Sequence, residues 1–130
     1  MGPELLVDYE EWTRFLVEFQ KYYAVQAAFW LREEGRESWY LYIPSPDITD
    51  ENFDRAYGKV IDILEELGNP PSDALRVKVI GADDPLAKAA LEFRRRNPTR
   101  KVMGIQGGTF GGLSVDWVLV YPLPVSVPAA

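Results

Sequence analysis

The sequence contains no cysteine and no histidine among its 130 residues. The absence of cysteine excludes disulfide bonds, thiolate metal ligands and cysteine nucleophiles. The absence of histidine excludes a Ser-His-Asp triad, a histidine general base and the common zinc sites. We therefore expect no metal ion and no cofactor, and any acid–base chemistry would have to use carboxylates.

Long hydrophobic runs are also absent, because no apolar stretch approaches the ~18 residues that a membrane-spanning helix requires. The N-terminus lacks the pattern of a signal peptide. Met1 and Gly2 open the chain as in a myristoylation signal, but Leu6 stands where that motif requires Ser or Thr. We expect a soluble, cytoplasmic protein without a membrane partner.

Basic side chains are in the minority, with 14 Lys and Arg against 20 Asp and Glu, so the formal net charge is −6. A negative domain repels nucleic acid, and we do not expect nucleic acid to be the partner. One cluster departs from this balance and suggests an anion site. Its five cations fall within eight residues: Arg94, Arg95, Arg96, Arg100 and Lys101.

Length and hydrophobic content indicate one globular domain over residues 1–121, followed by a proline-rich tail at 122–130. The order of periodic segments, α-ββ-α-β-α-(β)-β, predicts an α+β fold with helices packed on a mixed or antiparallel sheet. The strand in brackets is optional, and the segment before residue 113 is expected to be irregular. Helices are predicted at 9–21, 50–67 and 85–96, and strands at 24–32, 38–43, 75–80 and 113–121.

Glycine is concentrated in the segment 104–112, which holds five of the ten glycines. Glycine amides can point at a phosphate, so Gly107, Gly108, Gly111 and Gly112 are candidate anion ligands. The spacing fits neither G-x-G-x-x-G nor a P-loop. The alternative is a bulged turn in which positive φ angles require glycine.

Acidic residues gather at two predicted helix starts, after Thr49 and at Asp83 and Asp84. Paired carboxylates could hold Mg²⁺ or act as acid and base, but helix capping also explains them. A nuclease pattern that begins at Pro46-Asp47 fails, because Arg76 occupies the position of the metal-binding acid.

Asp116 is a single acid in an apolar strand, and it is the candidate functional acid of this sequence. Alternation with a period of two places Asp116 on the same face as Val118 and Val120. An acid on a buried face requires a partner, so Asp116 forms either a functional site or a structural salt bridge.

Aromatic residues in the two strands of the predicted hairpin suggest a binding face. If Trp30, Tyr40 and Tyr42 share one uncovered face of the sheet, they could bind a partner or stack on bases. If helices cover both faces, these residues belong to the core.

Four stretches of the sequence (27–31, 39–42, 81–87 and 110–112) together resemble a set of small bacterial proteins of about this length that have no assigned activity. The similarity runs from Asp8 to Pro122. The resemblance implies a bacterial, cytoplasmic context and supplies no catalytic residues.

These observations favour a non-catalytic binding domain that interacts with a protein partner, or with itself through a sheet edge or the aromatic face. The alternative is a phosphate- or nucleotide-handling enzyme that uses the glycine segment 104–112 and the basic cluster 94–101. A third hypothesis is nucleic-acid binding through the same basic cluster.

Overall fold

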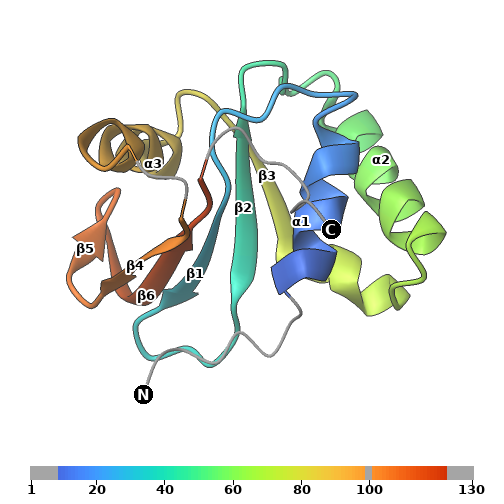
Figure 1. Ribbon diagram of the computed structural model, residues 1–130. Helices are drawn as coiled ribbons and strands as arrows, with labels where there is room; N and C mark the ends of the chain where they lie inside the picture. Colours follow the sequence, from blue (N-terminus) through green and yellow to red (C-terminus); the bar gives the residue numbers. More distant parts are fainter. Residues whose placement is uncertain (1–8, 99–100, 123–130) are drawn as a thin grey trace.

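The computed structural model describes residues 9–98 and 101–122 (Figure 1). Arg100 and the tail beyond Pro122 lie outside the described residues, and so does the residue 6 position of the myristoylation motif. The elements in chain order are α1 (Tyr9–Phe19), β1 (Phe29–Glu33), β2 (Tyr40–Ser45), α2 (Phe53–Glu66), the 3₁₀-helix η1 (Pro71–Arg76), β3 (Val77–Gly81), α3 (Pro85–Arg96), β4 (Met103–Gln106), β5 (Thr109–Phe110) and β6 (Leu113–Val120).

The strands form one six-stranded sheet in the order β3-β2-β1-β6-β4, and the short strand β5 pairs with β6. β2 and β3 are parallel, whereas the remaining neighbours are antiparallel. The predicted α+β class with helices packed on a mixed sheet is therefore confirmed. No helix in the described ranges combines the length and the apolar character that crossing a membrane requires.

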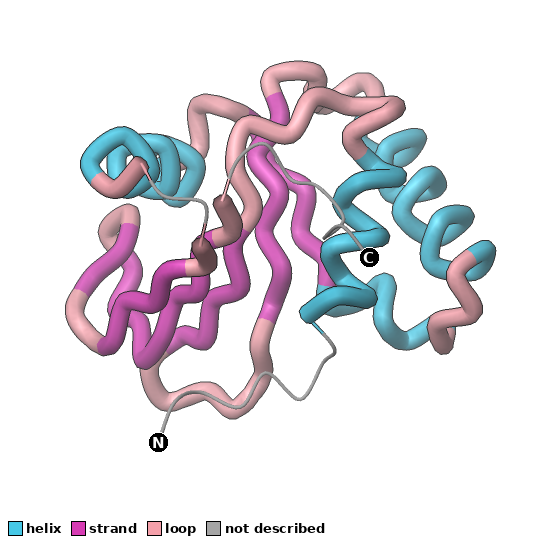
Figure 2. Tube along the Cα trace, viewed as in Figure 1, coloured by secondary structure: helices cyan, strands magenta, loops and turns pink. Residues whose placement is uncertain are grey.

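Helices cover both faces of the sheet. Figure 1 shows α1 and α2 side by side at the right of the view and α3 at the left, and Figure 2 shows the strands between these two groups. The core beneath α1 and α2 includes Trp12 and Val60, and the core beneath α3 includes Phe29 and Ala90. Burial of apolar side chains on both faces is the main stabilising contribution to this arrangement.

The register of the β1–β2 hairpin decides which aromatic residues share a face. Trp30 lies opposite Leu41, and both are fully buried beneath α1 and α2. Tyr42 lies opposite Phe29 on the other face, and Tyr40 follows the same alternation. The expectation that Trp30, Tyr40 and Tyr42 could form one uncovered face is therefore wrong.

Local capping predicts α3 better than α2. Asp84 caps α3 as expected, because its Oδ1 accepts a hydrogen bond of 2.9 Å from the Leu86 N–H. The helix α2 begins at Phe53 rather than directly after Thr49. Thr49 and Asn52 instead bond reciprocally: the Thr49 N–H donates to Asn52 Oδ1 (2.8 Å), and the Asn52 N–H donates to Thr49 Oγ1 (3.3 Å). This reciprocal pair has the pattern of a capping box and closes the turn that leads into α2.

Several strands differ from the sequence-based prediction. β1 begins at Phe29 rather than at residue 24, and β2 extends to Ser45 rather than ending at residue 43. The strand expected from residue 75 begins at Val77, because Pro71–Arg76 forms η1. Proline fixes φ near −65°, which suits a 3₁₀ turn and opposes pairing in a sheet. The segment expected to be irregular before residue 113 contains β4 and β5, which both pair with β6. The β5–β6 pairing is local, because Gly111 and Gly112 form the two-residue turn between Phe110 and Leu113, and a Gly-Gly pair is a hairpin signal that the prediction did not use.

Candidate interaction surface

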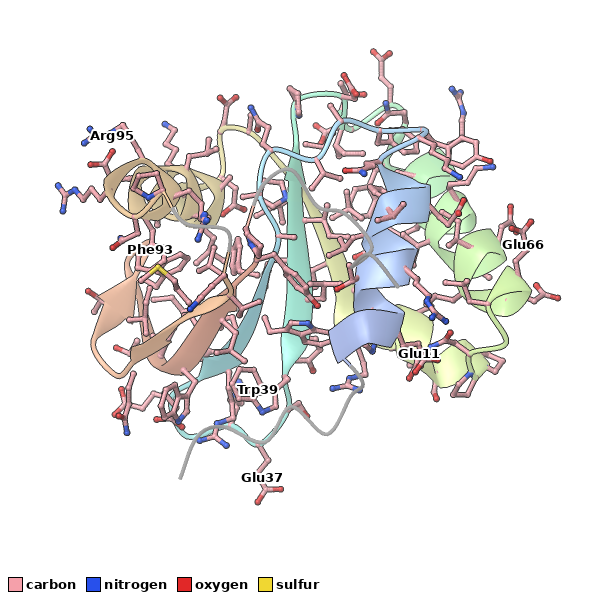
Figure 3. The ribbon with its side chains drawn as sticks, in the orientation of Figure 1. Glu11, Glu37, Trp39, Glu66, Phe93 and Arg95 are labelled. Atoms are coloured by element: carbon pink, nitrogen blue, oxygen red, sulfur yellow. The ribbon has the colours of Figure 1, made fainter. Side chains whose placement is uncertain are left out.

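Two arginines of the basic cluster share one carboxylate on α3. Glu92 Oε1 lies 2.6 Å from Arg95 Nη2 and 2.8 Å from Arg96 Nε. Hydrogen bonds from Arg95 and then Arg96 lower the pKa of Glu92 to about 2, so this carboxylate stays charged. Figure 3 shows Arg95 pointing outward from α3. Arg94 is partly buried, which lowers the pKa of its guanidinium, and Lys101 is exposed before β4.

The glycine segment forms turns within the sheet. Gly107, Gly108, Gly111 and Gly112 all have positive φ, between 61° and 83°. The Gly107 N–H already donates to the Asp116 carbonyl (2.8 Å), and the Gly108 carbonyl accepts from the Val115 N–H (3.0 Å). Gly111 and Gly112 connect β5 to β6. The positive φ angles account for these glycines, and their role as anion ligands stays a prediction.

The glycine turn and the arginines lie at different ends of α3. A Cβ added at Gly111 would stand 2.8 Å from the Pro85 carbonyl oxygen and 2.9 Å from Leu86 Cα. Gly111 therefore contacts the first turn of α3, whereas Arg94, Arg95 and Arg96 occupy its last turn. At a rise of about 1.5 Å per residue, these two groups are more than 10 Å apart along the helix.

Asp116 lies next to a shift in the pairing of β1 and β6, located between Arg32 and Glu33. The shift interrupts the expected alternation, because Val115 and Val118 both pack in the core beneath α3. Asp116 Oδ2 stands 3.7 Å from Arg32 Nε, and the Asp116 side chain is 37% exposed. The structure thus places Asp116 in a half-exposed salt bridge rather than alone on a buried face.

The other candidate carboxylates have structural partners or lie apart. Asp47 Oδ2 accepts a hydrogen bond of 2.8 Å from the Ala24 N–H, and Asp84 caps α3. Asp50 and Glu51 are exposed in the turn before α2. In the part of the chain that the structure describes, no three acidic residues gather in a way that could hold a metal ion.

Among the residues that the structure describes, the most exposed large hydrophobic side chain lies in η1. Leu75 is 78% exposed, more than the other exposed large hydrophobics. Those others belong to α2 or lie just beyond α1: Tyr22, Phe53 and Ile61. The exposure of Leu75 was not predicted, because the alternation of apolar residues assigned it to a strand with Val77 and Val79. The signal that could have found it is the pair Pro70-Pro71, which favours a turn before the strand.

Leu75 borders a depression of about 380 Å³ at one end of the sheet. The parallel pairing of Leu41 with Val77 brings the starts of β2 and β3 together, so Trp39-Tyr40 and Leu75-Arg76 become neighbours. We call the surface formed by Trp39, Tyr40, Leu75 and Arg76 the Leu75 surface. Figure 3 shows Trp39 and Glu37 at this lower end of the sheet. The depression is lined by Glu37, Ser38, Trp39, Tyr40, Leu75 and Arg76.

Cations stack on aromatic rings around this surface. Arg76 Cζ lies 5.2 Å from the centre of the Trp30 ring, and Lys78 Nζ lies 4.9 Å from the centre of the Tyr40 ring. Arg32 Cζ lies 5.7 Å from the Trp39 ring. Such contacts hold a cation in place without cancelling its charge. The aromatic rings thus form a rigid apolar surface, and the cations that stack on them hold positive charge in fixed positions beside it.

A larger depression of about 550 Å³ lies between the end of α1 and α2. Its walls carry Arg55, Lys59 and Asp62 beside Tyr22 and Tyr23. Charges of both signs alternate there, and Lys59 already stacks on Tyr22 at 4.1 Å. We consider the Leu75 surface the stronger candidate because it joins the most exposed apolar side chain to a tryptophan and an arginine.

Fold and surface together define a three-layer α+β domain in which an exposed leucine lies beside half-buried Tyr40 and Arg76. Comparisons of the chain with protein-family models, with curated proteins and with solved structures find no match. The function must therefore be argued from the surface.

Proposed function

We propose that this protein is a binding domain without catalytic activity and that it holds a segment of a partner protein on the Leu75 surface. The observation that carries the proposal is the 78% exposure of Leu75 directly beside Trp39, Tyr40 and Arg76. Exposing a leucine to water is unfavourable, and covering it would stabilise a complex by up to about 2 kcal/mol.

The residue types of the Leu75 surface support a protein partner. Tryptophan, tyrosine and arginine dominate the energetics of protein interfaces, because they bury large areas and offer oriented polar groups. Trp39 is only 7% exposed, so it forms a rigid support that loses little side-chain entropy, while Leu75 and half-buried Tyr40 and Arg76 supply the area that binding would cover. A volume of about 380 Å³ suits one or two bulky side chains of a peptide segment.

The bacterial, cytoplasmic setting is part of this proposal and is supported by the resemblance of the sequence to small bacterial proteins.

Self-association is the other binding mode that the sequence suggested. The sheet edge at β3 opposes it, because the Tyr57 hydroxyl occupies that edge: it donates to the Val77 carbonyl (2.7 Å) and accepts from the Val79 N–H (3.3 Å).

The test is selection from a random peptide library displayed on phage, followed by affinity measurement with individual peptides. We expect Leu75→Asp to weaken binding of the selected peptides by about tenfold or more, since an apolar anchor would be replaced by a charge. Ile61→Asp is the matched control because Ile61 is 50% exposed on α2, outside the Leu75 surface. Circular dichroism should show both variants folded. Equal binding by the parent and Leu75→Asp would contradict the proposal.

A further inference from the structure

We infer that the segment bound at the Leu75 surface is acidic, with a bulky apolar side chain flanked by carboxylates. This inference rests on the proposed function and names the chemistry of its partner. Arg76 and Lys78 carry it. Within residues 9–98 and 101–122, neither side chain forms an ion pair with a carboxylate. Each is held instead over an aromatic ring.

The two cations flank the depression from opposite faces of the sheet. Trp30, beneath Arg76, lies on the face that α1 and α2 cover, whereas Tyr40, beneath Lys78, lies on the other face. Leu75 stands next to Arg76 in the chain. A segment that places an apolar side chain against Leu75 and Trp39 therefore brings its flanking residues near positive charge on both sides.

Other cations near this end of the sheet are already compensated. Arg32 pairs with Asp116 at 3.7 Å, and Arg36 pairs with Glu33 at 4.0 Å. Glu37 is the one carboxylate among the residues that line the depression. On the lining Arg76 balances Glu37, so the positive charge in excess is that of the neighbouring Lys78, which stacks on Tyr40. This local charge favours an anion, although the whole chain has a net charge of −6. A local excess of positive charge steers an acidic partner to this site.

An acidic peptide fits this surface better than single-stranded nucleic acid does. Nucleic-acid binding needs a row of cations along a phosphate backbone, and its strength grows with the number of phosphates neutralised. The Leu75 surface offers one cation, Arg76, with Lys78 beside it on Tyr40, and a pocket of about 380 Å³ for side chains. A guanidinium such as that of Arg76 matches the geometry of a single carboxylate.

The experiment uses three short synthetic peptides and ¹⁵N-labelled full-length protein observed by two-dimensional NMR. The first peptide has a central leucine flanked by glutamates, the second replaces the glutamates by lysines, and the third replaces the leucine by serine. We expect the first peptide to shift the amide signals of Tyr40, Leu75 and Arg76 and to bind about tenfold more tightly than the lysine peptide. Raising salt from about 25 mM to about 300 mM should weaken its binding, because screening shortens the range of the attraction.

Three variants and one control separate charge preference from folding. Arg76→Gln and Lys78→Gln should each weaken binding of the glutamate peptide by about threefold, as expected for one exposed charge pair. Glu37→Gln removes the carboxylate on the lining and should strengthen the same binding by a similar factor, a gain that misfolding would not produce. Lys88→Gln, an exposed cation on α3, is the control and should leave binding unchanged.

The outcomes distinguish this inference from the proposed function. If the glutamate and lysine peptides bind equally at the Leu75 surface, the preference for acid is wrong and the proposed function stands. If none of the peptides shifts these signals and the library selection also fails, the proposed function is wrong. A thymidine oligonucleotide that shifts the same signals at lower concentration than the glutamate peptide would overturn the inference in favour of nucleic acid.

Discussion

Tyr57 shows how one hydroxyl group protects the edge of this sheet. β3 is an edge strand, and unpaired backbone groups on such strands invite pairing with other chains. The Tyr57 hydroxyl satisfies two of them, the Val77 carbonyl and the Val79 N–H. Phe53 packs against the Tyr57 ring with 4.9 Å between centroids and holds it in place.

We therefore expect Tyr57→Phe to lower the free energy of unfolding by about 1–3 kcal/mol, because it leaves two partly buried backbone groups without a partner. Urea denaturation followed by tryptophan fluorescence measures the change. Tyr22→Phe is the control, since Tyr22 is 56% exposed and its loss of a hydroxyl should cost less than about 0.5 kcal/mol. Parent-like stability of Tyr57→Phe would show that water replaces the hydroxyl at no cost.

The contact between the β5–β6 turn and α3 depends on two elements meeting closely. Gly111 lies against the backbone of Pro85 and Leu86, whereas Gly112, the next residue, has no atom within 4 Å of an added Cβ. Both glycines have positive φ, 61° and 83°. The two positions thus share backbone strain and differ in steric contact.

We predict that Gly111→Ala destabilises the protein by about 2–5 kcal/mol, the sum of left-handed strain and a steric overlap with backbone that cannot move aside. Gly112→Ala should cost only about 1–2 kcal/mol, from strain alone. Thermal unfolding monitored by circular dichroism compares the two variants. Equal losses would mean that α3 shifts to accommodate the added methyl group.

Stability of the whole molecule should depend on alkaline pH through two tyrosines. Burial is the main cause that raises the pKa of Tyr42 and of Tyr57 above 10. The acidic side chains Glu33 and Asp84 raise the pKa of Tyr42 further. A raised pKa in the folded state favours the protonated phenol, so the stabilisation is present below pH 10 and is lost as the pH rises through the folded-state pKa values.

We expect the urea midpoint to fall as the pH rises above about 10 and these phenols lose their protons. The double variant Tyr42→Phe and Tyr57→Phe should show a smaller fall over the same range. If the parent and the double variant decline in parallel, other groups cause the alkaline loss of stability.

The basic cluster at the end of α3 illustrates what sequence patterns predict for a site. Arg95 and Arg96 are visible as a run of charge, but their pairing with Glu92 depends on helical spacing and side-chain direction. In contrast, the Leu75 surface was not predictable as a whole. Leu75 and Trp39 are distant in sequence, and only the parallel pairing of β2 with β3 makes them neighbours.

Local chemistry accounts for much of the fold. Asp84 and Pro85 begin α3, Asn97 ends it, and Gly68 with a φ of 82° follows the end of α2, because capping and turn geometry involve residues a few positions apart. The α+β class follows from apolar periodicity in the same way.

Tertiary contacts decided the features on which function depends. Pairing with β6 turned part of an irregular-looking, glycine-rich segment into β4, and coverage by α1 and α2 buried Trp30 on the face opposite Tyr40. The exposure of Leu75 is likewise set by where β3 joins the sheet. These outcomes depend on contacts between residues that are far apart in the sequence. They therefore cannot be predicted from any short stretch of residues.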